Sequence, residues 1–369
     1  MAELILRRVR PMGGPLSDVV VDDGRIAVVG GAGPGGEGAI EFDGGGELLL
    51  PGLVDAHAHL DKTLWGLPWR SHTGGPDLAG LIANERAARR HLPPVTERAG
   101  ALLDACITHG VTTVRSHVDV DPDAGLGGVE GVLAAAEARR DQVTVEVVAF
   151  PQSGMLVEPG TAELMNAAVA AGCAAVGGLD PAGFDRDPVR HLDVVFGIAE
   201  RHGCKVDIHL HDRGELGAWQ IEAIIARTRA LGLAGRVTVS HAFAVATVPD
   251  ERFARIAAGL AEQRISLATV APGRTEPLPL RRLRDAGVNV CLGQDGIRDL
   301  WSPYGNGDLM ERAALLAWRS GFRGDDDIEL ALDTATFGGA RALGIDGYGL
   351  DPGSPADLVL LPAATVAGR

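Results

Sequence analysis

The residues best suited to chemistry are His57 and His59, two histidines separated by one residue. They follow the apolar run 48–54, which predicts a buried strand that ends here. Because side chains alternate along a strand, both imidazoles project from the same face. Neutral imidazole nitrogen is a good ligand for zinc or iron, so the pair is a candidate metal site. Taken alone, the two histidines could equally well be polar side chains with ordinary hydrogen bonds at a strand end.

Further ligand-type side chains stand where three later apolar runs end. The runs cover residues 205–209, 237–241 and 288–295, and the side chains at or just after their ends are His209, His211, Asp212, His241 and Asp295. Taken singly, each histidine could be a buried group with ordinary hydrogen-bond partners, and Asp295 could cap a helix. Taken together, they favour one metal-dependent site. His117 also stands at such an end, where we interpret it as a supporting or structural residue.

The elements that would position these residues alternate between short strands and longer helices. The expected strands end near or span 55–59, 113–120, 143–150, 174–179, 205–209, 237–241, 265–270 and 288–295. The expected helices between them include 77–91, 96–108, 129–140, 188–202, 218–231 and 250–263. Eight strand-then-helix units over about 250 residues predict an α/β fold, a (β/α)8 TIM barrel, which we expect to span 51–342. The carboxyl ends of the strands form one face of such a barrel, so the ligand-type residues would meet there.

The two ends of the chain predict a second, smaller domain made of β-structure. Residues 1–50 contain short β-type pieces separated by glycine and proline, and the chain after the barrel returns with another such piece at 356–361. We therefore expect a small β-sandwich-like domain from residues 1–50 and 343–369, with a short C-terminal part. The stretch 31–36 matches the G-x-G-x-x-G pattern of dinucleotide sites, but its glycines cannot open a helix, so we predict a hairpin loop.

Composition narrows the class of protein further. The chain carries 49 acidic and 34 basic side chains, a net charge of −15, which argues against a nucleic-acid partner because phosphate binding needs a basic surface. No apolar run reaches the roughly 20 residues that span a bilayer, so no membrane partner is expected. Four scattered cysteines and no signal-type segment favour a cytoplasmic location. Lysine occurs only at Lys62 and Lys205, so a lysine beside the histidine pair stands out.

Seven stretches resemble the amidohydrolase superfamily, and within it the branch of cytosine deaminase and N-isopropylammelide isopropylamidohydrolase. They are PGLVDAHAHLDK (51–62), VRSHVDVD (114–121), VEVVAFPQSG (145–154), VGGLDPA (176–182), VDIHLHD (206–212), VTVSHAF (237–243) and QDGIRDLWSPYGNGDLM (294–310). The resemblance covers nearly the whole chain. The Asp-Lys after the histidines, the HLHD motif and the IRDLW motif resemble the isopropylammelide enzymes more closely than cytosine deaminase.

The resemblance implies a metal cofactor, namely one divalent ion, zinc or iron, held by His57, His59, His209 and Asp295. Family members with two ions bridge them with a carboxylated lysine at the end of a middle strand, and the sequence has no lysine there. The ligand set leaves a position for water, whose pKa the ion lowers toward about 7. Asp295 would also take the proton from this water.

The same resemblance implies how protons move. His241 would orient the attacking water. An acid must then protonate the substrate before an amine can leave. His211 would be this acid, with Asp212 orienting its ring, and direct donation by Asp212 is the alternative.

Three further residues would bind the substrate. Gln152 matches the family glutamine that hydrogen-bonds a ring amide. Lys62 would bind an oxo or enolate oxygen, or else form a surface ion pair with Asp61, and Trp301 would stack on the ring, or else belong to the core. After the metal aspartate, cytosine deaminases place a second acidic residue that grips the pyrimidine, and this sequence has Gly296, which argues against cytosine.

These roles predict a hydrolase that acts on non-peptide carbon–nitrogen bonds. Metal-activated hydroxide would attack an amidine-like carbon of an aminopyrimidine, an aminotriazine or a creatinine-like ring, and ammonia or an alkylamine would leave. One alternative is opening of a cyclic amide ring at the same site, and another is a non-catalytic barrel that binds a metal or solute. The expected partner is a small nitrogen heterocycle, and the family favours a homo-oligomer.

Overall fold

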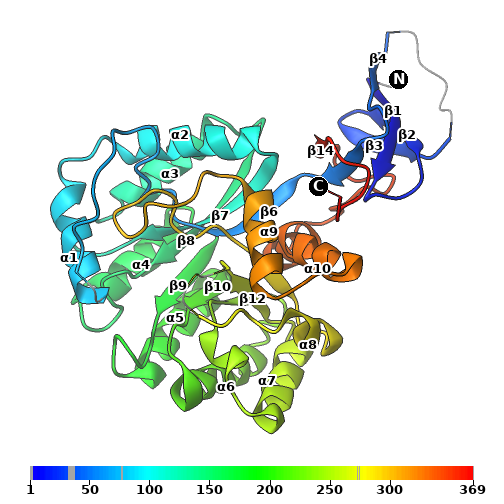
Figure 1. Ribbon diagram of the computed structural model, residues 1–369. Coiled ribbons are helices and arrows are strands. Elements are labelled where there is room, and N and C mark those ends of the chain that lie inside the picture. The colour runs from blue at the N-terminus through cyan, green and yellow to red at the C-terminus, as the bar shows by residue number, and fades with distance from the viewer. Residues whose placement is uncertain (1–2, 32–37, 76–77, 272, 274, 369) are drawn as a thin grey trace.

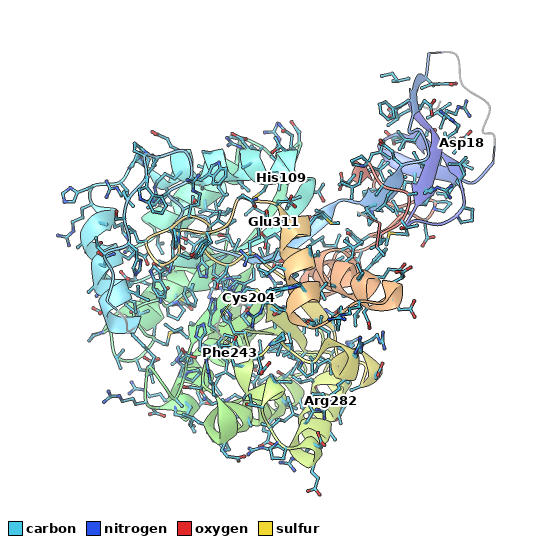
Figure 2. The ribbon with its side chains drawn as sticks, viewed as in Figure 1. Asp18, His109, Cys204, Phe243, Arg282 and Glu311 are labelled. Carbon is cyan, nitrogen blue, oxygen red and sulfur yellow. The ribbon has the colours of Figure 1, made fainter. Side chains whose placement is uncertain are left out.

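The computed structural model describes residues 3–31, 38–75, 78–271, 273 and 275–368. Eight parallel strands with helices around them form the larger part of the molecule, and a small sheet that contains both labelled chain ends projects from one side (Figure 1). Side chains from the strands and helices fill the space between the barrel strands and the helices around them (Figure 2). The predicted α/β barrel with a smaller β part is therefore confirmed.

The barrel strands are short and mostly buried, as expected for strands covered by helices on one face and by their neighbours on the other. In chain order they are β6 (Leu53–Ala58), β7 (Val111–Asp119), β8 (Thr144–Phe150), β9 (Ala175–Leu179), β10 (Lys205–His209), β11 (Val237–Ser240), β12 (Ser266–Thr269) and β13 (Val290–Leu292). Each pairs in parallel with the next. A parallel bridge between Ala58 and Asp295 joins the last strand to the first, and Asp295 N donates to His57 O at 2.8 Å. This closure places residues from the two ends of the barrel side by side.

Helices alternate with the strands along the chain. They are α1 (Leu78–Arg89), α2 (Val95–Thr108), α3 (Gly127–Glu137), α4 (Thr161–Ala170), α5 (Pro188–His202), α6 (Gly214–Ala230), α7 (Asp250–Glu262), α8 (Leu280–Asp285), α9 (Leu309–Arg319), α10 (Asp325–Ala335) and α11 (Phe337–Leu343), with a 3-10 turn η1 (Phe243–Ala246). Helix α5 shows why they begin and end where they do. The Asp187 side chain accepts from Arg190 N, Pro188 occupies the first turn, and Gly203 ends the helix with φ of 64°.

The small sheet combines both terminal segments. Its strands are β1 (Leu4–Pro11), β2 (Ser17–Asp22), β3 (Arg25–Val29), β4 (Ile40–Asp43), β5 (Leu48–Pro51) and β14 (Leu358–Leu361). Strand β14 runs antiparallel to β5, with Leu358 opposite Pro51, and β5 leads through Gly52 directly into β6. The division into domains of 1–50 plus 343–369 and of 51–342 remains a prediction. Residues 32–36 of the predicted hairpin loop lie outside the described residues.

The structure also bears on the question of membrane-spanning helices and on the cysteines discussed above. None of the described helices has both the length and the apolar character needed to cross a bilayer. Cys106, Cys173 and Cys291 are buried free thiols, and Cys204 is a half-buried one.

Candidate active site

The four predicted metal ligands converge at the carboxyl end of the barrel. Nε2 of His59 lies 3.3 Å from Asp295 Oδ1 and 3.4 Å from His209 Nε2. Nε2 of His57 lies 3.6 Å from the same Asp295 oxygen. Two ligand atoms that each lie about 2.1 Å from a tetrahedral ion are separated by about 3.4 Å. The spacing therefore fits one divalent ion between these side chains.

The surroundings of His57 fix which of its nitrogens faces the other ligands. The Ser240 hydroxyl donates to Asp207 Oδ1 at 2.7 Å, so its oxygen accepts from His57 Nδ1, which lies 2.9 Å away. Nδ1 therefore carries the hydrogen, and Nε2 is left with a free lone pair. Among the described residues, this buried Nε2 has no hydrogen-bond partner, which costs about 1–3 kcal/mol. A metal ion would satisfy it, as in other sites where a second residue orients a ligand histidine.

The ionisation of the cluster also suits a metal. Burial lowers the pKa of His59 to about 3 and holds the pKa of His209 well below 6.5. Burial alone would raise the pKa of Asp295, but the neighbouring rings of His57, His59 and His241 outweigh it, so this pKa lies well below 3.8. Neutral imidazoles and an ionised carboxylate are the forms that coordinate metals.

His117 lies in the same cluster. One ring nitrogen of each of His57, His59, His117 and His209 lies within 4.8 Å of those of the other three. Its Nε2 lies 3.4 Å from Asp207 Oδ1, and burial lowers its pKa to about 4. The sequence interpretation of His117 as a supporting or structural residue remains a prediction.

Residues at four barrel strand ends adopt left-handed backbone conformations that L-residues rarely take. The φ values are 35° for Asp180, 68° for His241, 49° for Ala271 and 63° for Asp295. Such conformations cost about 1–3 kcal/mol each and are typical of functional sites that the surrounding structure holds in place. They turn the chain sharply as it leaves the strands β9, β11, β12 and β13.

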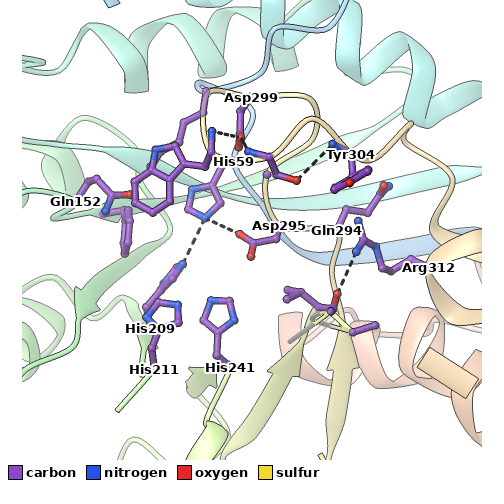
Figure 3. Close-up of a pocket in the computed structure, with 18 of the residues that line it drawn as sticks. His59, Gln152, His209, His211, His241, Gln294, Asp295, Asp299, Tyr304 and Arg312 are labelled. Carbon is purple, nitrogen blue, oxygen red and sulfur yellow. Dashed lines mark hydrogen bonds and ion pairs between the residues drawn. The ribbon is translucent and has the colours of Figure 1, made fainter. Parts of the chain in front are cut away.

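A cavity of about 410 Å³ opens above the ligand cluster (Figure 3). It is large enough for a substituted heterocycle. The predicted site residues that line it are His59, Lys62, Gln152, His209, His211, His241, Asp295 and Trp301. Phe150 and Leu179 supply apolar surface, and Arg312 and Asp299 add charged groups that the sequence did not indicate.

His211 is held by a residue other than the predicted one. Asp180 Oδ2 lies 2.9 Å from His211 Nδ1, and Asp180 Oδ1 accepts from His211 N at 2.6 Å. Burial alone would lower the pKa of His211, but the hydrogen bond to Asp180 outweighs it and the pKa is raised. The His211 ring stacks on the His241 ring, with 4.3 Å between their centroids. Burial and the neighbouring His211 keep the pKa of His241 well below 6.5.

The prediction that Asp212 orients His211 is wrong. The Asp212 carboxylate accepts from Gly183 N and from Gln220 Nε2, both at 2.9 Å. It therefore anchors the loop after β9 to helix α6. The chain turns after β10, so consecutive side chains at 211 and 212 point to different neighbours.

Lys62 is buried in the wall of the cavity. Its Nζ lies 3.1 Å from Asp119 Oδ1 and 3.7 Å from Glu85 Oε2, and it donates to Gln152 Oε1. The negative charges of Asp119, Glu85 and Asp61 outweigh the effect of burial and raise the pKa of Lys62. The alternative of a surface ion pair with Asp61 is wrong, because Lys62 is buried and the Asp61 carboxylate accepts from Asp119 N at 3.0 Å.

Trp301 lies against this lysine. Lys62 Nζ is 4.9 Å from the centroid of the Trp301 ring, and Trp301 Nε1 donates to Glu85 Oε2 at 2.5 Å. Glu85 comes from α1, so this helix holds the indole at the cavity. The indole plane and the lysine charge are thereby fixed relative to each other.

A model of the amidohydrolase family matches residues 41–367 of the chain. The chain belongs to the amidohydrolase family. This confirms the predicted family and, with it, a hydrolase with a TIM barrel and a metal-binding site. The metal-dependence of the family agrees with the histidine cluster described above.

Two curated relatives of this amidohydrolase illustrate the range of similarity. The chain is 39% identical over 280 residues to the uncharacterized protein YahJ of Escherichia coli (strain K12), a match that covers 75% of this chain and 61% of YahJ. The chain thus spans less than two thirds of that relative. It is 34% identical over 334 residues to N-isopropylammelide isopropyl amidohydrolase of Pseudomonas sp. (strain ADP), covering 87% of this chain and 81% of that enzyme.

Two crystal structures have similar folds. N-isopropylammelide isopropylaminohydrolase from Burkholderia multivorans ATCC 17616 superposes with a TM-score of 0.96 at 43% identity and covers 100% of this chain and 93% of that one. The 5-methylcytosine deaminase of Klebsiella pneumoniae liganded with phosphonocytosine gives a TM-score of 0.85 at 28% identity, over 99% and 92% of the two chains. These names describe an aminohydrolase of N-isopropylammelide and a deaminase of 5-methylcytosine.

Several residues that shape the site of this amidohydrolase were not predicted. Asp207 precedes His209 by two positions, so strand alternation alone would have placed it on the same face. Ser240 and Asp180 also stand at strand ends, which was a usable signal. Glu85 lies within a helix that follows a loop, and nothing in its sequence surroundings indicates that it reaches Trp301.

The glycine that follows the metal aspartate has a structural reason. A side chain at Gly296 would place its Cβ 1.9 Å from Asp299 Oδ2. Asp299 in turn accepts from Trp301 N and Ser302 N at 2.8 and 2.7 Å, which fixes the loop that carries the indole. The space beside Asp295 is therefore occupied by the side chain of Asp299.

Proposed function

We propose that the protein removes ammonia or an alkylamine from a nitrogen heterocycle with the help of one divalent ion, zinc or iron. The observation that carries this proposal is the convergence of His57, His59, His209 and Asp295 at the floor of a cavity whose walls carry additional groups able to move protons. A barrel that only binds a metal or solute has no need of these additional groups.

A single ion is supported by the side chains at the middle strands. Strand β8 is followed by Pro151 and Gln152 and strand β9 by Asp180, so neither end offers a lysine that could bridge two ions. When bound, such an ion supplies a water molecule whose pKa is lowered toward about 7. The ionised Asp295 would accept a proton from that water, and His241, which lines the cavity, would orient it.

His211 is the acid in this proposal. Asp180 binds its Nδ1 hydrogen and fixes the ring, which leaves Nε2 as the nitrogen available to the cavity. After attack at an amidine-like carbon, a proton from Nε2 would allow the exocyclic amine to leave. This role needs Asp180 as its support and does not need Asp212.

Lys62, Gln152 and Trp301 would hold the ring. The Gln152 carbonyl is engaged by Lys62, so its amide N–H groups remain for an acceptor on the substrate. Lys62 would neutralise an oxo or enolate oxygen, and Trp301 would stack on the ring face. Similarity to N-isopropylammelide and 5-methylcytosine enzymes supports an aminotriazine or aminopyrimidine, while Gly296 argues against cytosine itself.

The test is a screen for released ammonia or alkylamine on the metal-reconstituted protein, with aminopyrimidines, aminotriazines and creatinine-like imidazolones as substrates. Release of amine from one of these rings, with the matching oxo product, is the expected result. Loss of substrate without amine release would replace the proposal with the ring-opening alternative. No reaction with any ring class would favour a binding barrel.

A further inference from the structure

Arg312 is a second cation in the cavity, and its pairing differs from that of Lys62. It follows Glu311 near the start of α9 and lines the cavity (Figure 3). Its Nη1 donates to Val270 O at 3.2 Å. Within the part of the chain that the structure describes, no carboxylate forms an ion pair with this guanidinium, whereas Lys62 has two carboxylate partners.

The two cations border different parts of the cavity. Gln152 and Arg312 lie on either side of Asp295 in Figure 3. Lys62 belongs to the Gln152 side, because its Nζ donates to Gln152 Oε1. A ring that is held at Gln152 and reaches across the ligand cluster would turn its opposite edge toward Arg312.

The position of Arg312 is electrostatically unfavourable in the protein alone. Burial lowers the pKa of its guanidinium, and the charges of Asp295, Asp55 and Glu311 offset this only in part. A cation near the amino end of a helix also faces the positive end of the helix dipole. A guanidinium has five N–H donors, and the bond to Val270 uses one. A partly buried cation with donors that no described residue uses is suited to an anionic ligand.

Resting on the function proposed above, we propose that Arg312 binds a negatively charged substituent of the substrate, such as a carboxylate, on the ring edge that faces α9. The substrate class is then an anionic nitrogen heterocycle. A carboxylate accepts two parallel N–H bonds from a guanidinium, a geometry that a lysine cannot supply. Arg312 thus selects the substrate without taking part in proton transfer.

Arg319 is a matched control on the same helix. It lies about two turns after Arg312 and donates to Gly273 O at 2.8 Å and to Thr275 O at 2.5 Å. Both arginines therefore hold the segment after β12, but of the two Arg312 alone lines the cavity. A purely structural role for Arg312 predicts that Arg312→Met and Arg319→Met behave alike.

The experiment measures equilibrium binding of uracil carboxylates to the metal-loaded protein by calorimetry. Two pairs are compared, orotate with orotamide and uracil-5-carboxylate with uracil-5-carboxamide, because each amide matches its acid in shape but lacks the charge. In the wild type, at least one acid should bind about tenfold or more tightly than its amide, as expected for a charge-assisted pair. Arg312→Met should remove this preference, and Arg319→Met should keep it.

Absence of the preference in the wild type, including no binding of any of the four compounds, would overturn the inference, as would an unchanged preference in Arg312→Met. If Arg312→Met does not fold, Arg312→Lys replaces it in the experiment. Arg312→Lys should keep only part of the wild-type preference for the acid over its amide, and a preference equal to that of the wild type would overturn the inference. Amine release is measured separately with aminated rings. Charge preference without amine release would therefore refute the proposed function alone, and amine release without charge preference would refute this inference alone.

Discussion

The cavity has two sides of opposite character. The metal face consists of His59, His209 and Asp295, which line the cavity, together with the adjoining His57. The charged wall consists of Lys62 and Trp301, which line the cavity, together with their partners Glu85 and Asp119. On the metal face, burial keeps the imidazoles of His59 and His209 neutral, and His57 Nε2 has no hydrogen-bond partner among the described residues. On the charged wall, the lysine and the indole both have carboxylate partners.

The metal face therefore depends on an ion that the protein must bind, whereas the charged wall is built from the protein's own side chains. A buried polar atom without a partner is costly, and His57 Nε2 is such an atom beside the facing atoms of His59, His209 and Asp295, which suits a bound metal ion. On the charged wall, the lysine and the indole already have carboxylate partners. This wall can therefore position a substrate without first binding another ligand. Variants should therefore act on metal content when they change the metal face, and on substrate binding or stability when they change the charged wall.

The largest effect is expected for His57→Ala on the metal face. Removing the nitrogen that Ser240 orients should abolish tight metal binding, and amine release should fall to background with it. Elemental analysis and the amine-release assay are run on the same sample. Full metal content in this variant would show that His57 is not a ligand.

His211→Ala should separate catalysis from metal binding. The variant should keep its metal, while turnover falls by about 10²–10⁴-fold because a general acid has been removed. Asp180→Asn should lower turnover in the same direction, because Asp180 holds the ring. An unchanged rate in His211→Ala would mean that another group donates the proton.

Lys62→Met tests the charged wall. Leaving Asp119 and Glu85 without their cation should lower the free energy of unfolding by about 3 kcal/mol, and KM should rise more than kcat falls. Lys205→Met is the control, since this lysine pairs with Glu146 and lies outside the residues that line the cavity. Denaturant unfolding and steady-state kinetics distinguish the two variants, and an equal change of KM in both would remove Lys62 from substrate binding.

The smallest effect is expected for Asp212→Asn. Its carboxylate holds Gly183 N and Gln220 Nε2, so the variant should lose about 1 kcal/mol of stability and keep its turnover. A loss of turnover comparable with that of His211→Ala, at full metal content, would restore the catalytic role that the sequence suggested.

The sequence predicted what depends on local periodicity. Alternation placed His57 and His59 on one face, and eight strand–helix units placed them at the same barrel end as His209 and Asp295. It could not predict which carboxylate supports His211, because Asp180 and Asp212 both stand near strand ends and only the turn after β10 decides between them. Glu85 was out of reach for a similar reason, since its contact with Trp301 joins segments 216 residues apart.

The central claim is that the metal face holds one ion, and counting metal on the purified wild-type protein tests it most directly. Elemental analysis after reconstitution with zinc or iron should give about one equivalent per chain, because three imidazoles and one carboxylate form a single ligand set. Two equivalents held equally tightly, or none after careful reconstitution, would contradict the account.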